Sequence, residues 1–116
     1  MSGDEPARVA VVGAGYVGLT TAACLSHLGH DVTCADVDDA KVSALCEGVI
    51  PIHEEGLADL VRAGLAAGRL RFVVGAAAAV RGAEYVFLCE PTPQGSDGSG
   101  DMSYVQAVAA EIGDLL

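Results

Sequence analysis

The sequence has little that would bind nucleic acid, cross a membrane or form disulfide bonds. Only six of its 116 residues are Lys or Arg, against sixteen Asp or Glu, and a net charge of −10 argues against a surface for a phosphate backbone. No run of 18 apolar residues occurs, and the acidic start lacks the basic and apolar regions of a signal peptide. We therefore expect neither a nucleic-acid partner nor a membrane partner, and a cytoplasmic location.

Cysteine and aromatic residues are also sparse. The four cysteines form no CxxC pair and, with the three histidines, give no zinc-ligand spacing. They are expected to be reduced thiols, and no metal site is predicted. Tryptophan is absent and aromatic residues make up 4% of the chain, whereas glycine is abundant. This composition is typical of helices packed closely on a sheet.

Short β-branched runs alternate with helical patterns along the chain. Residues 8–12 are continuously apolar, as in a parallel strand that is buried on both faces. Strands are predicted at 8–12, 31–35, 71–74 and 84–89, and helices at 14–28, 38–47, 54–67, 76–80 and from 101 onward. The alternation predicts the α/β class, a Rossmann-type doubly wound parallel sheet of about four strands in the order 3-2-1-4.

A glycine motif directly follows the first predicted strand. Its first glycine, Gly13, permits a tight turn, Gly15 lets a diphosphate approach the backbone, and Gly18 lets the helix pack on the strand. The diphosphate would meet amides at a helix N-terminus, those of Tyr16 and Val17. Context makes the motif informative, because it follows a strand, opens a helix and precedes a second strand.

The second predicted strand leads to an acidic residue at the expected place. Asp36 lies 18 residues after Gly18 and is expected to accept hydrogen bonds from the adenosine ribose. A carboxylate there repels a 2′-phosphate, so the predicted cofactor is NAD and not NADP. On chemistry alone, Lys41 is either a solvated lysine or a second ribose contact.

Four blocks give the sequence its resemblance to the UDP-glucose/GDP-mannose dehydrogenase family. The third and fourth blocks are more specific than the glycine motif. The blocks are residues 12–19 (VGAGYVGL), 36–38 with Lys41 (DVD…K), 51–57 with 68–70 (PIHEEGL…GRL), and 89–93 with 101–105 (CEPTP…DMSYV). The sequence departs from the family pattern at Glu55, where proline is usual, and at Glu90, where a small or apolar residue is usual.

The resemblance implies roles for individual residues. It places Tyr16 and Val17 at the diphosphate, Asp36 and Lys41 at the adenosine ribose, and Pro91 and Thr92 beside the nicotinamide. Members of the family oxidise the primary alcohol of a nucleotide sugar to a carboxylate with two NAD and a water, through a cysteine thioester. The family's cysteine motif, acid–base lysine and sugar-binding domain find no counterpart in these 116 residues. No catalytic residue is therefore expected in the chain.

The expected organisation is a disordered lead-in over residues 1–7 and an incomplete NAD-binding domain over 8–116. The parent enzyme would be an NAD-dependent oxidoreductase acting on a UDP- or GDP-sugar in polysaccharide biosynthesis. The leading alternative is a non-catalytic NAD-sensing domain of potassium-transport type, and another is a part of a hydroxy-acid or hydroxyacyl dehydrogenase. A sheet that ends at residues 84–89 would present an apolar edge, so self-association is also predicted.

Overall fold

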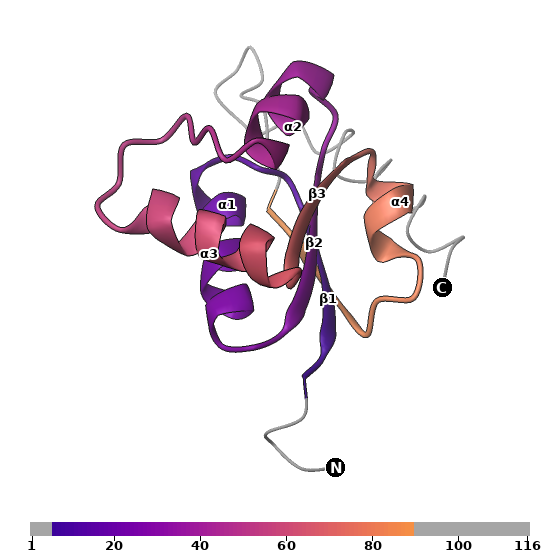
Figure 1. Ribbon diagram of the computed structural model, residues 1–116. Coiled ribbons are helices and arrows are strands. Elements are labelled where there is room, and N and C mark those ends of the chain that lie inside the picture. The colour runs from indigo at the N-terminus through magenta and orange to yellow at the C-terminus, as the bar shows by residue number, and fades with distance from the viewer. Residues whose placement is uncertain (1–5, 90–116) are drawn as a thin grey trace, which may run out of the picture.

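The computed structural model describes residues 6–89 and contains a parallel sheet with helices on both faces (Figure 1). The strand order is β3-β2-β1-β4, as predicted. In chain order the elements are β1 (Arg8–Val12), α1 (Tyr16–His27), β2 (Asp31–Asp36), α2 (Asp39–Cys46), α3 (Leu57–Ala67), β3 (Leu70–Val74), α4 (Ala76–Val80) and β4 (Tyr85–Leu88). The predicted α/β class and doubly wound sheet are confirmed.

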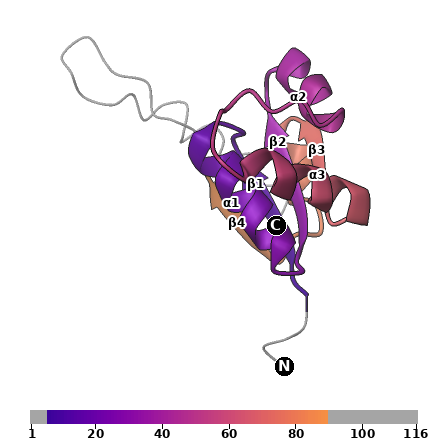
Figure 2. The same ribbon diagram turned by 60° about the vertical axis from the view of Figure 1, so that its left-hand side comes forward.

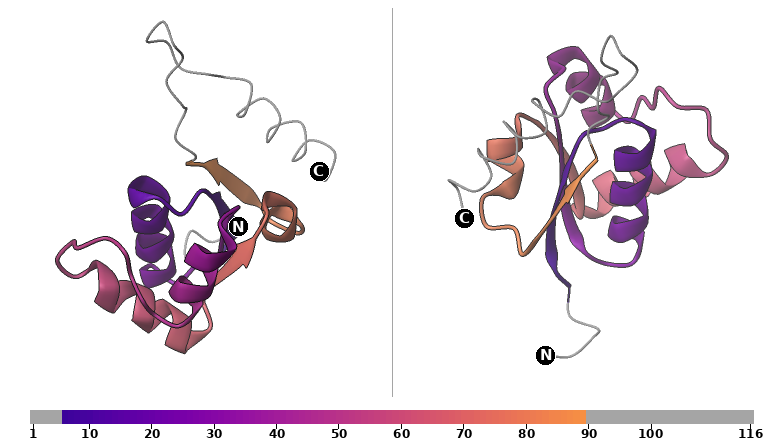
Figure 3. Two further views of the ribbon diagram at one scale, coloured as in Figure 1. Left: turned by 90° about the horizontal axis from the view of Figure 1, so that it is seen from above. Right: turned by 180° about the vertical axis from the view of Figure 1, so that it is seen from behind.

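Alternate residues of β1 enter two different cores, which explains its unbroken apolar run. Val9 and Val11 pack among the buried residues of α1, α2 and α3. Ala10 and Val12 pack instead against α4. Seen from above, α4 lies across the sheet from the other three helices (Figure 3). A strand covered on both faces needs apolar side chains at every position, and β1 has them from Val9 onward.

Helix α3 begins later than the sequence pattern suggests. The predicted start was Glu54 or Glu55, but the helix begins at Leu57. The reason is Gly56, which has the left-handed angles φ 82° and ψ −17° and so cannot lie inside a right-handed helix. Helix α1 likewise begins at Tyr16 instead of residue 14, because Ala14 and Gly15 belong to the preceding turn.

Ala7, at the end of the predicted lead-in, is part of the packed structure. Ala7 is buried, its amide donates to His30 Nδ1 at 3.1 Å, and its carbonyl accepts from the amide of Asp31 at 3.0 Å. These bonds join the entry to β1 with the entry to β2. The imidazole of His30 thus helps to fix the start of β1.

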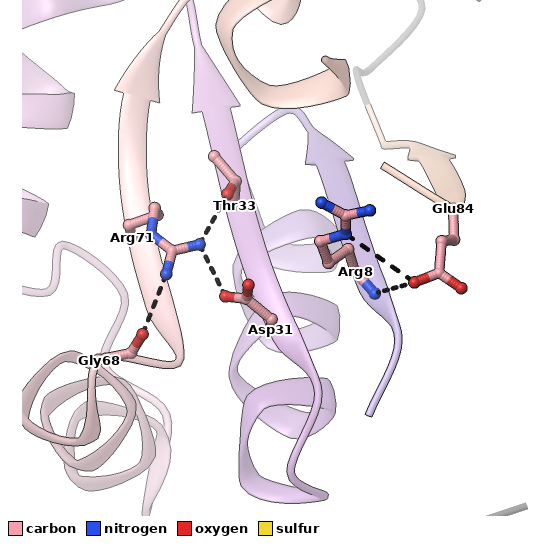
Figure 4. Close-up of polar contacts among 6 residues, drawn as sticks. All are labelled: Arg8, Asp31, Thr33, Gly68, Arg71 and Glu84. Atoms are coloured by element: carbon pink, nitrogen blue, oxygen red, sulfur yellow. Dashed lines mark hydrogen bonds and ion pairs between the residues drawn. The ribbon is translucent and has the colours of Figure 1, made fainter. Parts of the chain in front are cut away.

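Ion pairs connect neighbouring strands near their amino ends (Figure 4). Arg71 on β3 donates to Asp31 Oδ1 on β2 at 2.7 Å and to the carbonyl of Gly68 at 3.0 Å. Toward the other edge of the sheet, Arg8 Nε lies 4.0 Å from Glu84 Oε1. All four charged side chains of these pairs are exposed, so each pair contributes at most about 1 kcal/mol to stability.

Candidate functional site

The glycine turn after β1 is held in place from two sides. Gly13 has φ 109°, which favours glycine, and its amide donates to the carbonyl of Ala35 on β2 at 2.7 Å. A Cβ on Gly18 would stand 1.6 Å from the carbonyl oxygen of Gly13 and 3.2 Å from Cys89 Cβ. Only glycine therefore lets α1 approach the turn so closely, as the motif predicted.

Gly15 is different, because no contact within residues 6–89 explains why it is glycine. Its φ of −77° and ψ of −165° are open to other residues. A Cβ built on it would meet no atom within 4 Å. The space beside Gly15 is therefore open to a ligand that approaches the backbone, which fits the diphosphate of a dinucleotide.

The first amides of α1 lack acceptors within the helix. The first hydrogen bond of α1 runs from the amide of Leu19 to the carbonyl of Gly15, at 2.8 Å. The amides of Tyr16, Val17 and Gly18 precede it, and no side-chain hydrogen bond caps the helix. Tyr16 and Val17 are both exposed. Three amides and the positive end of the helix dipole therefore meet beside the open space at Gly15.

Asp36, the last residue of β2, is buried against this turn. Its Oδ2 accepts from the amide of Ala14 at 2.9 Å and from Lys41 Nζ at 3.3 Å. Its Oδ1 accepts from the amide of Asp38 at 3.0 Å. Burial favours the neutral acid, but the amides of Asp38 and Ala14 and the ammonium of Lys41 outweigh it and hold the pKa of Asp36 below its ordinary value of 3.8. The carboxylate is therefore charged at neutral pH.

Lys41 takes its position from the start of α2. Asp38 is the N-cap of that helix, and its Oδ1 accepts from the amide of Lys41 at 3.1 Å. The side chain then turns back to Asp36 and is about one-third exposed. Lys41 is therefore not an isolated surface lysine: its ammonium lies at the acid beside the glycine turn.

The described residues of the predicted site gather at the carboxyl ends of β1 and β2. Pro91 and Thr92 lie outside the described residues. The amide of Cys89, just after β4, donates to the carbonyl of Val12 at 2.7 Å, so β4 ends beside the same turn. The carboxyl edge of an open parallel sheet is where ligands bind in this architecture.

One contact at the site was not foreseen from the sequence. The Tyr16 phenol donates to Glu54 Oε1 at 2.6 Å, across 38 residues. The hydrogen bond to this carboxylate, together with its negative charge, raises the pKa of the Tyr16 phenol above its ordinary value of 10.0. The sequence predicts Glu54 as the start of a helix and as part of a family block, but no periodic pattern connects it with the glycine motif.

The parallel sheet, the glycine turn at the end of β1 and the acid at the end of β2 define a dinucleotide-binding Rossmann domain. Residues 7–116 match the NAD binding domain of the UDP-glucose/GDP-mannose dehydrogenase family. The chain belongs to this family, and NAD as the predicted cofactor is confirmed. Family membership also decides against the potassium-transport and hydroxy-acid alternatives.

Individual relatives agree with this assignment. The chain is 40% identical over 109 residues to UDP-glucose 6-dehydrogenase TuaD of Bacillus subtilis, covering 94% of this chain and 24% of that protein. It is 46% identical over 109 residues to a UDP-glucose 6-dehydrogenase of Pseudomonas aeruginosa, with the same coverage. The chain thus spans about a quarter of the length of these relatives.

Solved structures of similar proteins have the same fold. A UDP-glucose dehydrogenase from Pyrobaculum islandicum superposes with a TM-score of 0.89 at 38% identity, over 96% of this chain and 26% of that one. A ternary complex of GDP-mannose dehydrogenase from Pseudomonas aeruginosa gives a TM-score of 0.86 at 38% identity, over 91% of this chain and 24% of that one.

Within residues 6–89, no helix is long and apolar enough to cross a bilayer.

Proposed function

We propose that the turn at Gly15 binds the diphosphate of NAD through the amides of Tyr16 and Val17. Asp36 and Lys41 then hold the adenosine ribose. The observation that carries this proposal is Gly15, whose missing side chain leaves open space beside three amides without helical acceptors. A backbone cradle also suits a chain whose net charge of −10 offers few cationic side chains to an anionic ligand.

The remaining contacts of the proposed site come from the family resemblance. Gly13 and Gly18 belong to the same proposed site and shape its turn, Gly13 through its φ of 109° and Gly18 through its close approach to the carbonyl of Gly13. Pro91 and Thr92 border the nicotinamide in this proposal. They follow Cys89, whose amide bonds to Val12 at the end of β1.

In a protein of the relatives' length, this domain would serve the oxidation of a nucleotide sugar. The relatives are named UDP-glucose and GDP-mannose 6-dehydrogenases. We infer the same reaction class, an NAD-dependent oxidation of the sugar's primary alcohol to a carboxylate, with a UDP- or GDP-sugar as substrate. The residues that react with the sugar would lie outside this chain, which by itself binds NAD and is inactive.

The test is calorimetric titration of NAD into the 116-residue chain and into its Gly15→Ala variant. The added methyl occupies the space proposed for the diphosphate, so NAD affinity should fall at least about tenfold, a loss of about 1.4 kcal/mol. The fold should be unchanged, because the methyl meets no atom of residues 6–89 within 4 Å. Equal affinities for the two proteins would contradict the proposed site.

Two further properties are proposed. The outer edge of β4 supports self-association, because Tyr85, Phe87 and Leu88 are 52%, 42% and 46% exposed. Among the described strands, β4 pairs only with β1. A cytoplasmic location is supported by Cys24 and Cys46, which form no disulfide bond within residues 6–89. Sedimentation at increasing concentration tests the first property, and fractionation of cells that produce the chain tests the second.

A further inference from the structure

The hydrogen bond between Tyr16 and Glu54 connects two parts of the chain at the mouth of α1. Tyr16 is the first residue of α1, and Glu54 lies in the connection from α2 to α3. This connection passes on the α1 side of the sheet (Figures 1 and 2). At 2.6 Å, the hydrogen bond between Tyr16 and Glu54 is short and charge-assisted, and it lies at the surface.

The connection does not depend on this bond for its own position. Ile50 and Ile52 pack against the core that β1 shares with α1, α2 and α3. Arg62 Nε donates to the carbonyl of Gly48 at 3.0 Å. The carbonyl of Glu54 also accepts from the amide of Leu57 at 3.1 Å. The backbone is therefore fastened by other contacts, and what the side chain of Glu54 adds is control over the Tyr16 ring.

The Tyr16 ring necessarily lies near the proposed diphosphate site. Side chains of a helix lean toward its N-terminus, so the ring on the first residue projects beyond the start of α1. The ring is half exposed, and packing alone leaves it free to take other rotamers. Some of these would lie across the amides of Tyr16 and Val17, where an incoming diphosphate has to bind.

We propose that Glu54 is a positioning residue of the NAD site, which fixes the Tyr16 ring beside the mouth of α1 and keeps the amides of Tyr16 and Val17 accessible. This inference rests on the proposed function. It gives the block at residues 51–57 a role in cofactor binding, through the hydrogen bond from Tyr16 of the glycine motif to Glu54.

The experiment measures NAD affinity in the 116-residue chain and in four variants. Glu54→Ala and Tyr16→Phe should each weaken binding about three- to tenfold, and the double variant no more than either, because both remove one hydrogen bond. Glu54→Gln keeps an acceptor oxygen and should restore affinity to within about twofold. The matched control is Glu55→Gln, which removes a charge from the exposed neighbouring residue and should leave binding unchanged.

A second readout follows the phenol itself. Titration of the tyrosines by ultraviolet difference spectroscopy, with Tyr16→Phe to assign the signal, should give Tyr16 a raised pKa in the wild type and a lower one in Glu54→Ala. The Glu55→Gln variant should titrate like the wild type. This readout requires no NAD, so it tests the contact apart from the cofactor.

The outcomes separate the inference from the function on which it rests. If the wild type binds no NAD, both fail. If it binds NAD and Glu54→Ala binds equally well, only the positioning role fails. If Glu54→Ala and Glu54→Gln both bind NAD more tightly, Glu54 acts by repelling the diphosphate, and the positioning role is again overturned. An unchanged Tyr16 pKa in Glu54→Ala would overturn it as well.

Discussion

Asp36 holds the amide of Ala14, so the acid at the end of β2 fixes the glycine turn that follows β1. The bond is 2.9 Å long, buried, and spans 22 residues. The same oxygen accepts from Lys41, and the other accepts from the amide of Asp38. Most of the accepting capacity of this carboxylate is therefore used inside the chain, before any ribose reaches it.

The first prediction concerns stability against pH. The folded pKa of Asp36 lies below its ordinary value of 3.8, so the native state binds fewer protons than the unfolded state. The stabilisation is present above about pH 4 and is lost as pH falls through the folded pKa. Asp36→Asn should cost about 1–3 kcal/mol at pH 7, and the difference from wild type should shrink as the solution is acidified.

Urea unfolding of both proteins between pH 3 and pH 7 measures this difference. Glu47→Gln, which changes an exposed acid at the end of α2, serves as the control and should parallel the wild type. A difference between wild type and Asp36→Asn that stays constant down to pH 3 would show that the charge of Asp36 is not what stabilises the turn.

The second prediction separates two glycines of one motif. Gly18→Ala forces a methyl against the carbonyl of Gly13 and should destabilise the fold by about 3 kcal/mol. The methyl of Gly15→Ala meets no atom in the described part of the chain within 4 Å, so the stability of this variant should stay within about 1 kcal/mol of wild type. Thermal and urea unfolding without NAD check both values. Equal losses of stability would mean that Gly15 is needed by the fold itself, which would weaken the argument for a ligand there.

The third prediction uses Lys41, the only lysine of the chain. If NAD covers Lys41, acylation of its amine by a water-soluble ester should slow about tenfold when NAD is present at ten times its dissociation constant. The N-terminal amine reacts in the same sample and is the internal control. NADP at the same concentration should protect less, because its 2′-phosphate would approach the carboxylate of Asp36. Mass spectrometry after digestion measures both sites, and unchanged reactivity of Lys41 would remove it from the site.

The fourth prediction concerns the edge of the sheet. Phe87→Lys places a charge on β4 and should reduce self-association, since charged residues on an edge strand oppose pairing with another chain. Leu28→Lys is the matched control, because Leu28 is an exposed apolar residue at the end of α1, away from β4. Sedimentation velocity over a range of concentrations measures the effect. If the wild type stays monomeric throughout, β4 does not mediate self-association.

Much of the architecture was determined by the sequence alone, because it depends on local periodicity and on residues with special backbone angles. The apolar run of β1, the cap at Asp38 and the glycine motif each specify their element within a few residues, and the strand order follows from the alternation of elements. Gly56 marks the limit of such reasoning, since its left-handed conformation, and not the helical pattern around it, decides where α3 begins.

Only the tertiary structure decided which side chains meet at the site. Asp36 and Ala14 are 22 residues apart, and Tyr16 and Glu54 are 38 apart. A hydrogen bond requires two atoms within about 3 Å. The side-by-side placement of β1 and β2 brings residues that are distant in the sequence to within this distance. The spacing of these residues along the chain does not by itself predict such a contact. The sequence therefore determined that a glycine turn and an acid exist, and packing determined that the acid fixes the turn and that Glu54 bonds to Tyr16.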